Sequence, residues 1–351
     1  MKLKKKKENI TIDDIAKYAG VSKTTISRYL NGKYEYMSND TKKRIRDIIL
    51  KYDYKPSNIA RSLKTKNTKL IAFVVSDIEN NFAAPTIKSM NEALLNTGYH
   101  MIVASSNNLV EQEKELIESL IEQRVDAILL NPVSYEADYI KEISKKLPII
   151  LIDRAIKDAN LDIVASASDS SMQEGMEHLK RSGFSDLYLF TENYQEVQTR
   201  LKRVDSFKRM LDYFMFSKEF IEKSVKVIEP RNYINIEKHI INIIESTTNG
   251  IPAIICTNGR TLLSTALCIK KLKIRMPYQL GLMGYDDFGI NTALGWTEVT
   301  QTTITTLAPD WYELGKKAID LVLKRIENPK GCKKNIKTNI KLIIKESTKL
   351  L

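Results

Sequence analysis

The sequence lacks the residues and runs that several protein classes require. It has only three cysteines, none in a C-x-x-C pair, so neither a disulfide framework nor a zinc site is expected, and a reducing compartment fits best. Its three histidines, His100, His178 and His239, have no metal-ligand spacing and no Ser or Cys partner pattern. No apolar run reaches the roughly 18 residues of a membrane span. We therefore expect no metal, no cofactor and no membrane partner.

Enzyme and export signatures are also missing. The sequence has no phosphate-cradling Gly-rich loop, no nucleophile elbow and no Walker-type motif. Residues 1–8 are basic but lack the apolar core of a signal peptide, so a cytoplasmic protein is expected. The sequence therefore favours a binding protein over an enzyme.

Positive charge is concentrated in the first fifth of the chain. The 351 residues carry a net charge of +12, and residues 1–69 hold 19 Lys or Arg against 7 Asp or Glu. The rest of the chain holds 36 residues of each sign. A basic module on a neutral body is typical of polyanion binding, because neutralised phosphates release condensed counterions. A solubilising charged surface is the alternative.

The first part of the basic segment has the pattern of two short helices joined by a tight turn. Thr11 can cap the first helix, and Asp14 lies three residues later, where a carboxylate favours the positive helix end. Gly20 permits the positive φ of a turn, and Ser22 can cap the second helix. Two such helices form a DNA-reading unit whose second helix can enter the major groove.

The second helix, residues 23–30, presents a polar outer face. Ile26, Tyr29 and Leu30 are spaced to point inward. The side chains left outside are Lys23, Thr24, Ser27 and Arg28. Lys and Arg can donate to guanine O6 and N7, and Thr can contact a thymine methyl group. Ser38 is predicted to cap a third helix that runs to about Tyr52.

Residues 54–69 are predicted to form a short linker with a helix of about two turns. Pro56 can start this helix, because its missing N–H would be unpaired there in any case. Ile59, Ala60 and Leu63 share one apolar face, while Arg61 can contact phosphate. Such a helix is marginal in isolation, and a plain interdomain linker is the alternative.

Residues 70–351 alternate between apolar runs and helical stretches. Leu70–Val75 is a continuous apolar run, as in a strand buried on both faces. Further strands are predicted at 100–104, 125–130, 148–153, 187–190, 225–228, 253–256, 280–283 and 340–344, with helices such as 84–97 and 110–123 between them. Strands alternating with helices imply parallel βαβ units. We therefore predict an α/β body made of two similar open sheets.

Polar residues follow several of these predicted strands. Ligands of open parallel sheets bind beyond the carboxyl ends of the strands. The residues at these ends are Ser76-Asp77, Asn131, Asp153-Arg154, Asn258 and Asp286-Asp287. Carboxylates, amides and an arginine that converge between two lobes suit a polyhydroxylated ligand. Helix caps and strand-end turns use the same residue types, which is the alternative for any single position.

The N-terminal spacing also resembles a known family signature. Residues 11–32 read Thr-Ile-x-Asp-Ile-Ala-x-x-Ala-Gly-Val-Ser-x-x-Thr-Ile-Ser-Arg-x-Leu-Asn-Gly, which resembles the lactose-repressor family that includes the galactose and purine repressors. The resemblance implies DNA contacts from Thr11, Ser22, Lys23, Thr24, Thr25, Ser27, Arg28, Asn31 and Tyr54 and, in a hinge helix, from Ser57, Asn58, Ala60, Arg61 and Leu63. By the same resemblance Leu63 is a wedge between base pairs in the minor groove.

The body resembles the effector domain of the same family, which is related to periplasmic sugar-binding proteins. Residues that match the family's ligand motifs are Asn81, Phe82, Asp153, Arg154, Arg203, Asn258, Asp286 and, in the crossover segment 305–315, Trp311. An aromatic ring at position 311 would stack on a sugar face. Asn131 and Tyr233 complete the predicted effector contacts.

Three departures from the family pattern bear on the ligand. Ala167-Ser168, Gly259 and Pro309 replace residues that usually touch it, which disfavours the commonest neutral sugars. Residues 30–38 and 295–297 resemble a branch that regulates the use of sugar acids such as ketodeoxygluconate and hexuronates. Arg154, Arg203 and Arg260 can pair with a carboxylate, in agreement with that branch.

The sequence thus predicts three parts and one allosteric function. A small all-α helix-turn-helix domain spans 1–54, a hinge spans 55–69, and a two-lobed, parallel-sheet effector and dimerisation domain spans 70–351. We expect a homodimer that represses carbohydrate genes at a near-palindromic operator, because the chain ends soon after its last strand, without a tetramer-forming coil. Control by a purine or by a protein co-effector, and a free sugar-binding protein, are the alternatives.

Overall fold

The computed structural model describes residues 10–54, 67–80, 82–286, 300 and 302–350. The chain divides into two compact units, Met1–Thr68 and Lys69–Leu351, each with its own core. The predicted hinge contacts Ser57, Asn58, Ala60, Arg61 and Leu63 lie outside the described residues, as do Asn81 and the segment 295–297.

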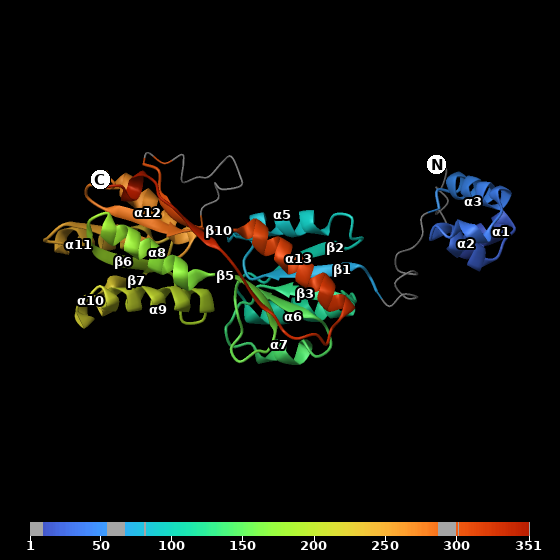
Figure 1. The fold of residues 1–351 in the computed structure, drawn as a ribbon, viewed down its shortest axis with the longest axis horizontal. Helices are drawn as coiled ribbons and strands as arrows, with labels where there is room; N and C mark the ends of the chain where they lie inside the picture. Colours follow the sequence, from blue (N-terminus) through green and yellow to red (C-terminus); the bar gives the residue numbers. More distant parts are fainter. Residues whose placement is uncertain (1–9, 55–66, 81, 287–299, 301, 351) are drawn as a thin grey trace, which may run out of the picture. The chain divides into compact units, whose positions relative to one another are not determined.

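The first unit is a small helical bundle (Figure 1). Its elements are α1 (Ile12–Ala19), α2 (Lys23–Leu30), the 3-10 helix η1 (Tyr34–Tyr36) and α3 (Asn39–Lys51). Ile15, Ile26 and Ile45 contribute one fully buried side chain from each α-helix to a common core. The helical periodicity of the sequence therefore identified the buried face of each helix.

The helix ends follow the predicted capping chemistry. The Thr11 backbone N–H donates to Asp14 Oδ2 at 2.9 Å, and the Thr11 hydroxyl accepts from the Asp14 N–H at 3.3 Å, which closes a capping box. Gly20 has a φ of +62° at the turn. Ser22 and Ser38 cap α2 and α3 by accepting a backbone N–H three residues later. These predictions are confirmed.

The second unit contains two six-stranded sheets. The first has the order β11-β5-β4-β3-β1-β2, from β1 (Leu70–Val75), β2 (His100–Ser105), β3 (Ala127–Leu130), β4 (Ile149–Ile152), β5 (Asp162–Ser166) and β11 (Asn335–Thr338). The second has the order β12-β10-β9-β8-β6-β7, from β6 (Phe184–Thr191), β7 (Val225–Val227), β8 (Ile251–Cys256), β9 (Gly281–Tyr285), β10 (Thr305–Pro309) and β12 (Ile340–Ile343). The described pairings are parallel, except that β10 and β12 are antiparallel.

Helices cover both faces of each sheet (Figure 1). On the first sheet, α5 (Ala83–Leu94) and α13 (Trp311–Glu327) cover one face, and α6 (Val110–Glu122) and α7 (Asp138–Ile143) cover the other. On the second sheet, α8 (Ser168–Arg181), α9 (Gln198–Tyr213) and α10 (Lys218–Ser224) lie opposite α11 (Tyr233–Ser246) and α12 (Gly259–Lys271). The short helix η3 (Glu346–Thr348) follows β12. The predicted two-lobed α/β fold is confirmed.

The sequence did not predict β5, β10 and β11 as strands. β11 reads Asn-Ile-Lys-Thr and lies at a sheet edge, where one side of the strand faces water, so it has no long apolar run. Although it is late in the chain, β11 joins the first sheet, and α13 packs on the same sheet. Both lobes are therefore completed by the C-terminal segment.

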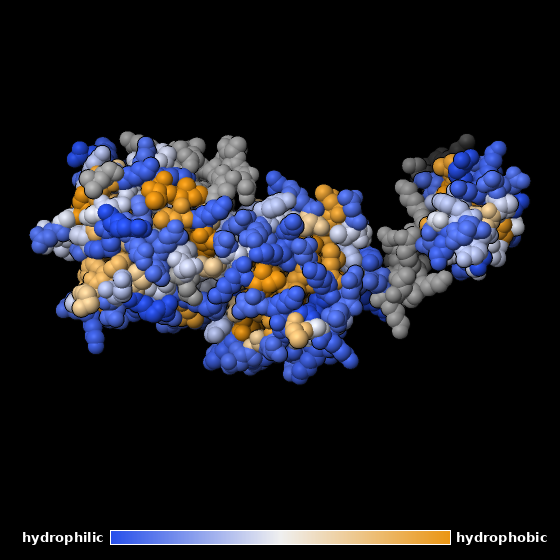
Figure 2. All heavy atoms as spheres, viewed as in Figure 1, coloured by the Kyte–Doolittle hydropathy of each residue, from blue (hydrophilic) through white to orange (hydrophobic). Residues whose placement is uncertain are grey.

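The surface of both units is mostly hydrophilic on the face that Figure 2 shows. In the described part of the chain, no helix is long and apolar enough to cross a membrane.

Candidate functional site

The outer face of α2 presents the predicted DNA-reading side chains. Lys23, Thr24 and Arg28 are exposed, while Thr25 and Ser27 are half-buried. Lys23 Nζ lies 2.8 Å from Asp13 Oδ2, and both side chains are more than half exposed. Such a surface ion pair is worth little in water, so Lys23 can exchange Asp13 for a phosphate.

Arg28 is positioned by an aromatic ring. Its guanidinium lies 4.8 Å from the centroid of the Tyr36 ring, and Lys42 Nζ lies 3.9 Å from the Tyr34 ring. Both tyrosines belong to η1, which follows α2. Cation–π contacts of this kind orient a cation and leave its hydrogen-bond donors available. The sequence identified Arg28 but not the tyrosines that hold it.

Other predicted DNA contacts are engaged in local structure. Thr11 and Ser22 donate and accept within their helix caps, and the Asn31 amide donates to the Ser27 carbonyl at 2.8 Å. Tyr54 packs against the helical core, and burial raises its pKa. These four side chains fix the geometry of the reading helix within the unit.

In the second unit, most of the predicted effector residues gather between the two lobes. A cavity of about 30 Å³ is lined by Asn80, Phe82, Asp153, Arg154, Val197, Thr199, Arg200, Arg203, Asn258, Asp286 and Trp311. We call this set the inner pocket. Its residues follow the carboxyl ends of β1, β4, β8 and β9, or belong to the N-cap and first two turns of α9 and to the start of α13. This is where ligands of open parallel sheets bind.

Two buried donors of the inner pocket have no hydrogen-bond partner in the described structure. They are Arg203 Nε and Trp311 Nε1, on residues that are only 5% and 6% exposed. The Arg203 guanidinium lies 3.7 Å from the Tyr285 ring centroid and donates to the Thr257 carbonyl, and the Trp311 ring tilts against Phe82. A buried N–H without an acceptor is costly, so this pocket is suited to a ligand rich in acceptors.

The inner pocket also concentrates positive charge. Burial, with the neighbouring Arg200 next, lowers the pKa of Arg154 to about 10. Burial lowers the pKa of Arg200 as well, against the opposing effect of Glu192, with which it forms an ion pair. A pKa near 10 leaves Arg154 charged at neutral pH, which lowers the cost of placing an anion in the pocket.

The acidic and amide groups of the inner pocket are held by specific contacts. Asp286 Oδ2 accepts the Gly259 N–H at 2.9 Å, and burial raises the pKa of Asp286 although Arg203 opposes the shift. Asp153 Oδ1 accepts the Ser166 hydroxyl at 2.9 Å. Asn258 caps α12, so the capping interpretation and the pocket interpretation both apply to this residue.

A second cavity of about 190 Å³, the outer pocket, adjoins the inner one. It is lined by Asp77, Asn80, Asn108, Val133, Arg154, Glu192, Asn193, Glu196, Val197, Arg200 and Arg260. Here Arg260 Nη2 of the second lobe lies 2.5 Å from Asp77 Oδ2 of the first. The two pockets share Asn80, Arg154, Val197 and Arg200, so a ligand too large for the inner pocket would also extend into the outer one.

Sequence reasoning missed Arg200 and Glu192. Arg200 lies three residues before Arg203 on α9, a spacing that places both on one helix face and could have identified it. Glu192 directly follows β6 and accepts from the Asn258 amide at 2.6 Å. No sequence signal distinguishes Glu192 from an ordinary exposed loop carboxylate.

Two predicted effector residues lie elsewhere. Asn131 is fully buried, donates to the Ile152 carbonyl at 2.9 Å and accepts from the Ser76 hydroxyl at 2.7 Å, so it ties strand ends together. Tyr233 is 44% exposed on α11 and lines a separate surface cavity with Leu267 and Cys268. Neither residue lines the inner or outer pocket.

Metal binding finds no support among the described residues. No group of three or more His, Cys, Asp or Glu side chains in that part of the chain is arranged to hold a metal ion.

Both units match family models. Residues 11–57 match the model described as bacterial regulatory proteins, lacI family. Residues 68–346 match the model described as periplasmic binding proteins and sugar binding domain of the LacI family. The two matches cover most of the chain.

Relatives match over nearly their whole length. The chain is 31% identical to the HTH-type transcriptional regulator KdgR of Bacillus subtilis, over 98% of this chain and 99% of that protein. It is 26% identical to the regulator PtxS of Pseudomonas putida, over 97% of each chain. A crystal structure of the lac repressor dimer bound to operator and the anti-inducer ONPF matches with a TM-score of 0.82 at 18% identity, over 97% of this chain and 99% of that one.

These matches agree with the capped reading helix in the first unit and with the interlobe pocket in the second. The chain therefore belongs to the lacI family of bacterial regulatory proteins: it is a transcription regulator that joins a DNA-binding helix-turn-helix to a periplasmic-binding-protein-like domain, and not an enzyme.

Proposed function

We propose that this chain is a cytoplasmic, homodimeric repressor of carbohydrate genes whose operator affinity is set by a sugar acid bound between the lobes. The observation that carries the proposal is the inner pocket, where Arg154, Arg200 and Arg203 surround a space that, among the described residues, two carboxylates line. Arginine is suited to carboxylates because its planar fork donates two parallel hydrogen bonds.

The remaining groups of the inner pocket suit the hydroxylated part of such a ligand. Asp153 and Asp286 can accept from hydroxyl groups, and Trp311 offers a ring face and an unpartnered N–H. The resemblance to the sugar-acid branch and the similarity to the regulator named KdgR are consistent with this ligand class.

DNA recognition is assigned to α2. Two copies of this helix would lie in successive major grooves of a near-palindromic operator, with Arg28 and Lys23 as base and phosphate contacts. The lac repressor relative is described as a dimer bound to operator, which supports the same arrangement here. The predicted contacts of the hinge, including the Leu63 wedge, belong to this proposal.

A thermal-shift titration of the purified full chain tests the ligand class. Hexuronates and ketogluconates are compared with neutral sugars and purines, since a ligand at about 100 times its Kd adds roughly 2.7 kcal/mol to the free energy of unfolding. We expect a sugar acid to raise the melting temperature and Arg203→Ala to abolish the rise.

The matched control is Arg209→Ala, an exposed arginine farther along the same helix, which should keep the full response. A response to a neutral sugar or a purine alone would refute the sugar-acid class. No response to any of these compounds would favour a protein co-effector.

A further inference from the structure

A further pocket lies beside the inner pocket and is not part of the effector site described above. Its volume is about 280 Å³. Its lining residues are Leu151, Asp153, Ala155, Ile156, Ala159–Leu161, Ile163, Ala165, Ser166, Ser168, Gln198, Thr199, Lys202, Lys333–Asn335 and Lys337. We call it the lysine pocket. Of these residues, only Asp153 and Thr199 also line the inner pocket.

The lysine pocket carries an excess of positive charge. Four of its lining residues are lysines, and one is a carboxylate, Asp153. Lys333 Nζ is already 3.4 Å from the buried Asp162. Within the described residues, Lys202 and Lys337 have no carboxylate at ion-pair distance.

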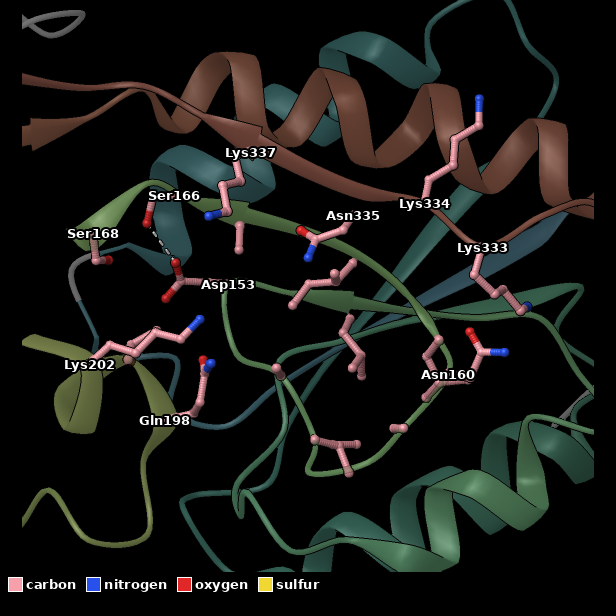
Figure 3. Close-up of a pocket in the computed structure, with 18 residues that line it drawn as sticks. Asp153, Asn160, Ser166, Ser168, Gln198, Lys202, Lys333, Lys334, Asn335 and Lys337 are labelled. Carbon is pink, nitrogen blue, oxygen red and sulfur yellow. Dashed lines mark hydrogen bonds between the residues drawn. The ribbon is translucent and has the colours of Figure 1, made fainter. Parts of the chain in front are cut away.

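Two of the lysines converge at one end of the pocket. Figure 3 shows Lys202 and Lys337 directed toward the end that holds Asp153 and Ser166, whereas Lys334 turns away. The Asp153 carboxylate accepts the Ser166 hydroxyl, and its charge also acts on Arg154 of the inner pocket. The single carboxylate of Asp153 is therefore shared between Arg154 and the two lysines. The end of the pocket that holds Lys202 and Lys337 keeps a net positive charge.

The start of α9 adds to the same potential. Gln198 and Thr199, its first two residues, line the pocket. The first turn of this 16-residue helix contains no acidic side chain, and Val197 provides no side-chain cap. The partial positive charge of the helix end is therefore not offset by a side chain of the N-cap or of the first turn.

We propose that the lysine pocket binds a small phosphate ester the size of a single sugar phosphate. Lysine is a strongly hydrated point charge, and two of them suit the dianion of a phosphate monoester. The amides of Asn160, Gln198 and Asn335 can serve hydroxyl groups, and an apolar wall that includes Ile156 and Ile163 can contact the carbon skeleton. The volume of the lysine pocket is slightly below the range of pockets that hold drug-sized ligands, so its occupant must be a small molecule.

Occupancy of this pocket would couple to the effector site. Lys202 belongs to α9 of the second lobe and Lys337 to β11 of the first, so one phosphate bridges the two lobes. The same ligand would redirect Asp153, which lines both pockets. Coupling between two binding sites is reciprocal. If a bound phosphate ester changes the affinity for the effector by some factor, the bound effector changes the affinity for the phosphate ester by the same factor.

Calorimetric titration of the full chain at constant ionic strength tests the proposal. The probes are glucose 6-phosphate, glycerol phosphate and inorganic phosphate, with glucose as the uncharged comparison. We expect one saturable site per chain for at least one phosphate ester, and an increase in Kd of about tenfold or more in Lys202→Gln/Lys337→Gln, because two charge-assisted contacts are lost. If inorganic phosphate competes with the ester for the site, the phosphate group is the part of the ester that the pocket recognises.

Two matched variants make the result specific. Lys146→Gln/Lys341→Gln changes the charge equally, at one exposed lysine in each lobe outside the pocket, and should bind as the wild type does. Arg203→Ala removes a contact of the inner pocket only, so it should retain phosphate-ester binding even if it loses the sugar acid. Unchanged binding in the double pocket variant, loss in Arg203→Ala, or no binding of any probe would overturn the proposal.

Discussion

At the residue scale, the effector site holds a few buried polar groups that fold stability alone does not explain. Arg203 Nε and Trp311 Nε1 have no acceptor within the described structure, and burial raises the pKa of Asp286. Each of these features costs stability in the free protein. Binding sites accept such costs because a ligand supplies the missing partner.

Replacing Trp311 by phenylalanine separates ligand binding from folding. The variant keeps an aromatic ring but loses both the N–H that has no partner and part of the buried indole. These two losses have opposite effects on the free energy of unfolding, so the melting temperature of the free protein should change little. The Kd for the sugar acid should increase at least about fivefold, the equivalent of one lost hydrogen bond. Calorimetric titration and thermal melts of both proteins measure this, and an unchanged Kd would remove Trp311 Nε1 from the ligand contacts.

The Asp286→Asn variant tests the electrostatic part of the site. Because burial raises the folded-state pKa of Asp286 above its ordinary 3.8, the ionisation of this carboxyl group favours the unfolded state and lowers the stability of the fold at neutral pH. The neutral variant should therefore melt at a higher temperature than the wild type at pH 7. The difference should shrink as the pH falls through the raised pKa toward 3.8, where the wild-type carboxyl becomes neutral as well.

Melting temperatures of both proteins, taken from pH 8 down to the lowest pH at which each stays folded, give the result. A less stable variant at every pH would show that the Gly259 and Arg203 contacts outweigh the burial of Asp286.

At the element scale, apolar periodicity predicted most of the fold, and contacts between distant segments were beyond its reach. The buried faces of α1, α2 and α3 and the apolar runs of β1 and β8 follow directly from residue spacing. The edge strand β11 has no apolar run, and its place in the first sheet depends on pairing with β5. Glu192 has no such signal, and it became a site residue only once the fold placed it beside Asn258 and Arg260.

The contact between α13 and α5 is close enough to require glycine. A Cβ built on Gly315 would lie 2.6 Å from Ser89 Oγ and 3.0 Å from the Met90 backbone nitrogen. Gly315→Ala should therefore lower the free energy of unfolding by about 1–3 kcal/mol, the usual cost of overpacking. Lys316→Ala, at the next and exposed position, is the control and should change it by no more than about 0.5 kcal/mol. Denaturant unfolding of both variants measures this, and equal stabilities would contradict the close packing.

At the scale of the whole effector unit, lobe movement links the pockets to function. Arg260 and Asp77 form an ion pair across the lobes in which Asp77 is only 14% exposed. The inner pocket alone is too small for a sugar, so a ligand enters when such contacts open. The pair therefore contributes to the barrier for ligand exchange.

Removal of this ion pair should accelerate ligand exchange. Arg260→Gln is expected to raise the dissociation rate of the sugar acid by about 2–5-fold, since partly exposed ion pairs contribute up to about 1 kcal/mol. Arg231→Gln is the matched control, because its partner Glu79 lies 4.0 Å away and both side chains are largely exposed. Stopped-flow displacement gives both rates, and equal rates in the two variants would rule out the Arg260 pair as an interlobe latch.

The central claim is that a sugar acid in the arginine-lined cleft controls DNA binding by α2. Fluorescence anisotropy measures this most directly. A DNA duplex that the full chain selects from a random pool is labelled, and the protein is titrated into it with and without the sugar acid. The account predicts a change in DNA affinity of about 5–150-fold in the wild type, the usual range of allosteric coupling, and no change in Arg203→Ala. The Arg28→Ala variant should no longer bind the selected duplex. A wild-type DNA affinity that every sugar acid leaves unchanged would contradict the account.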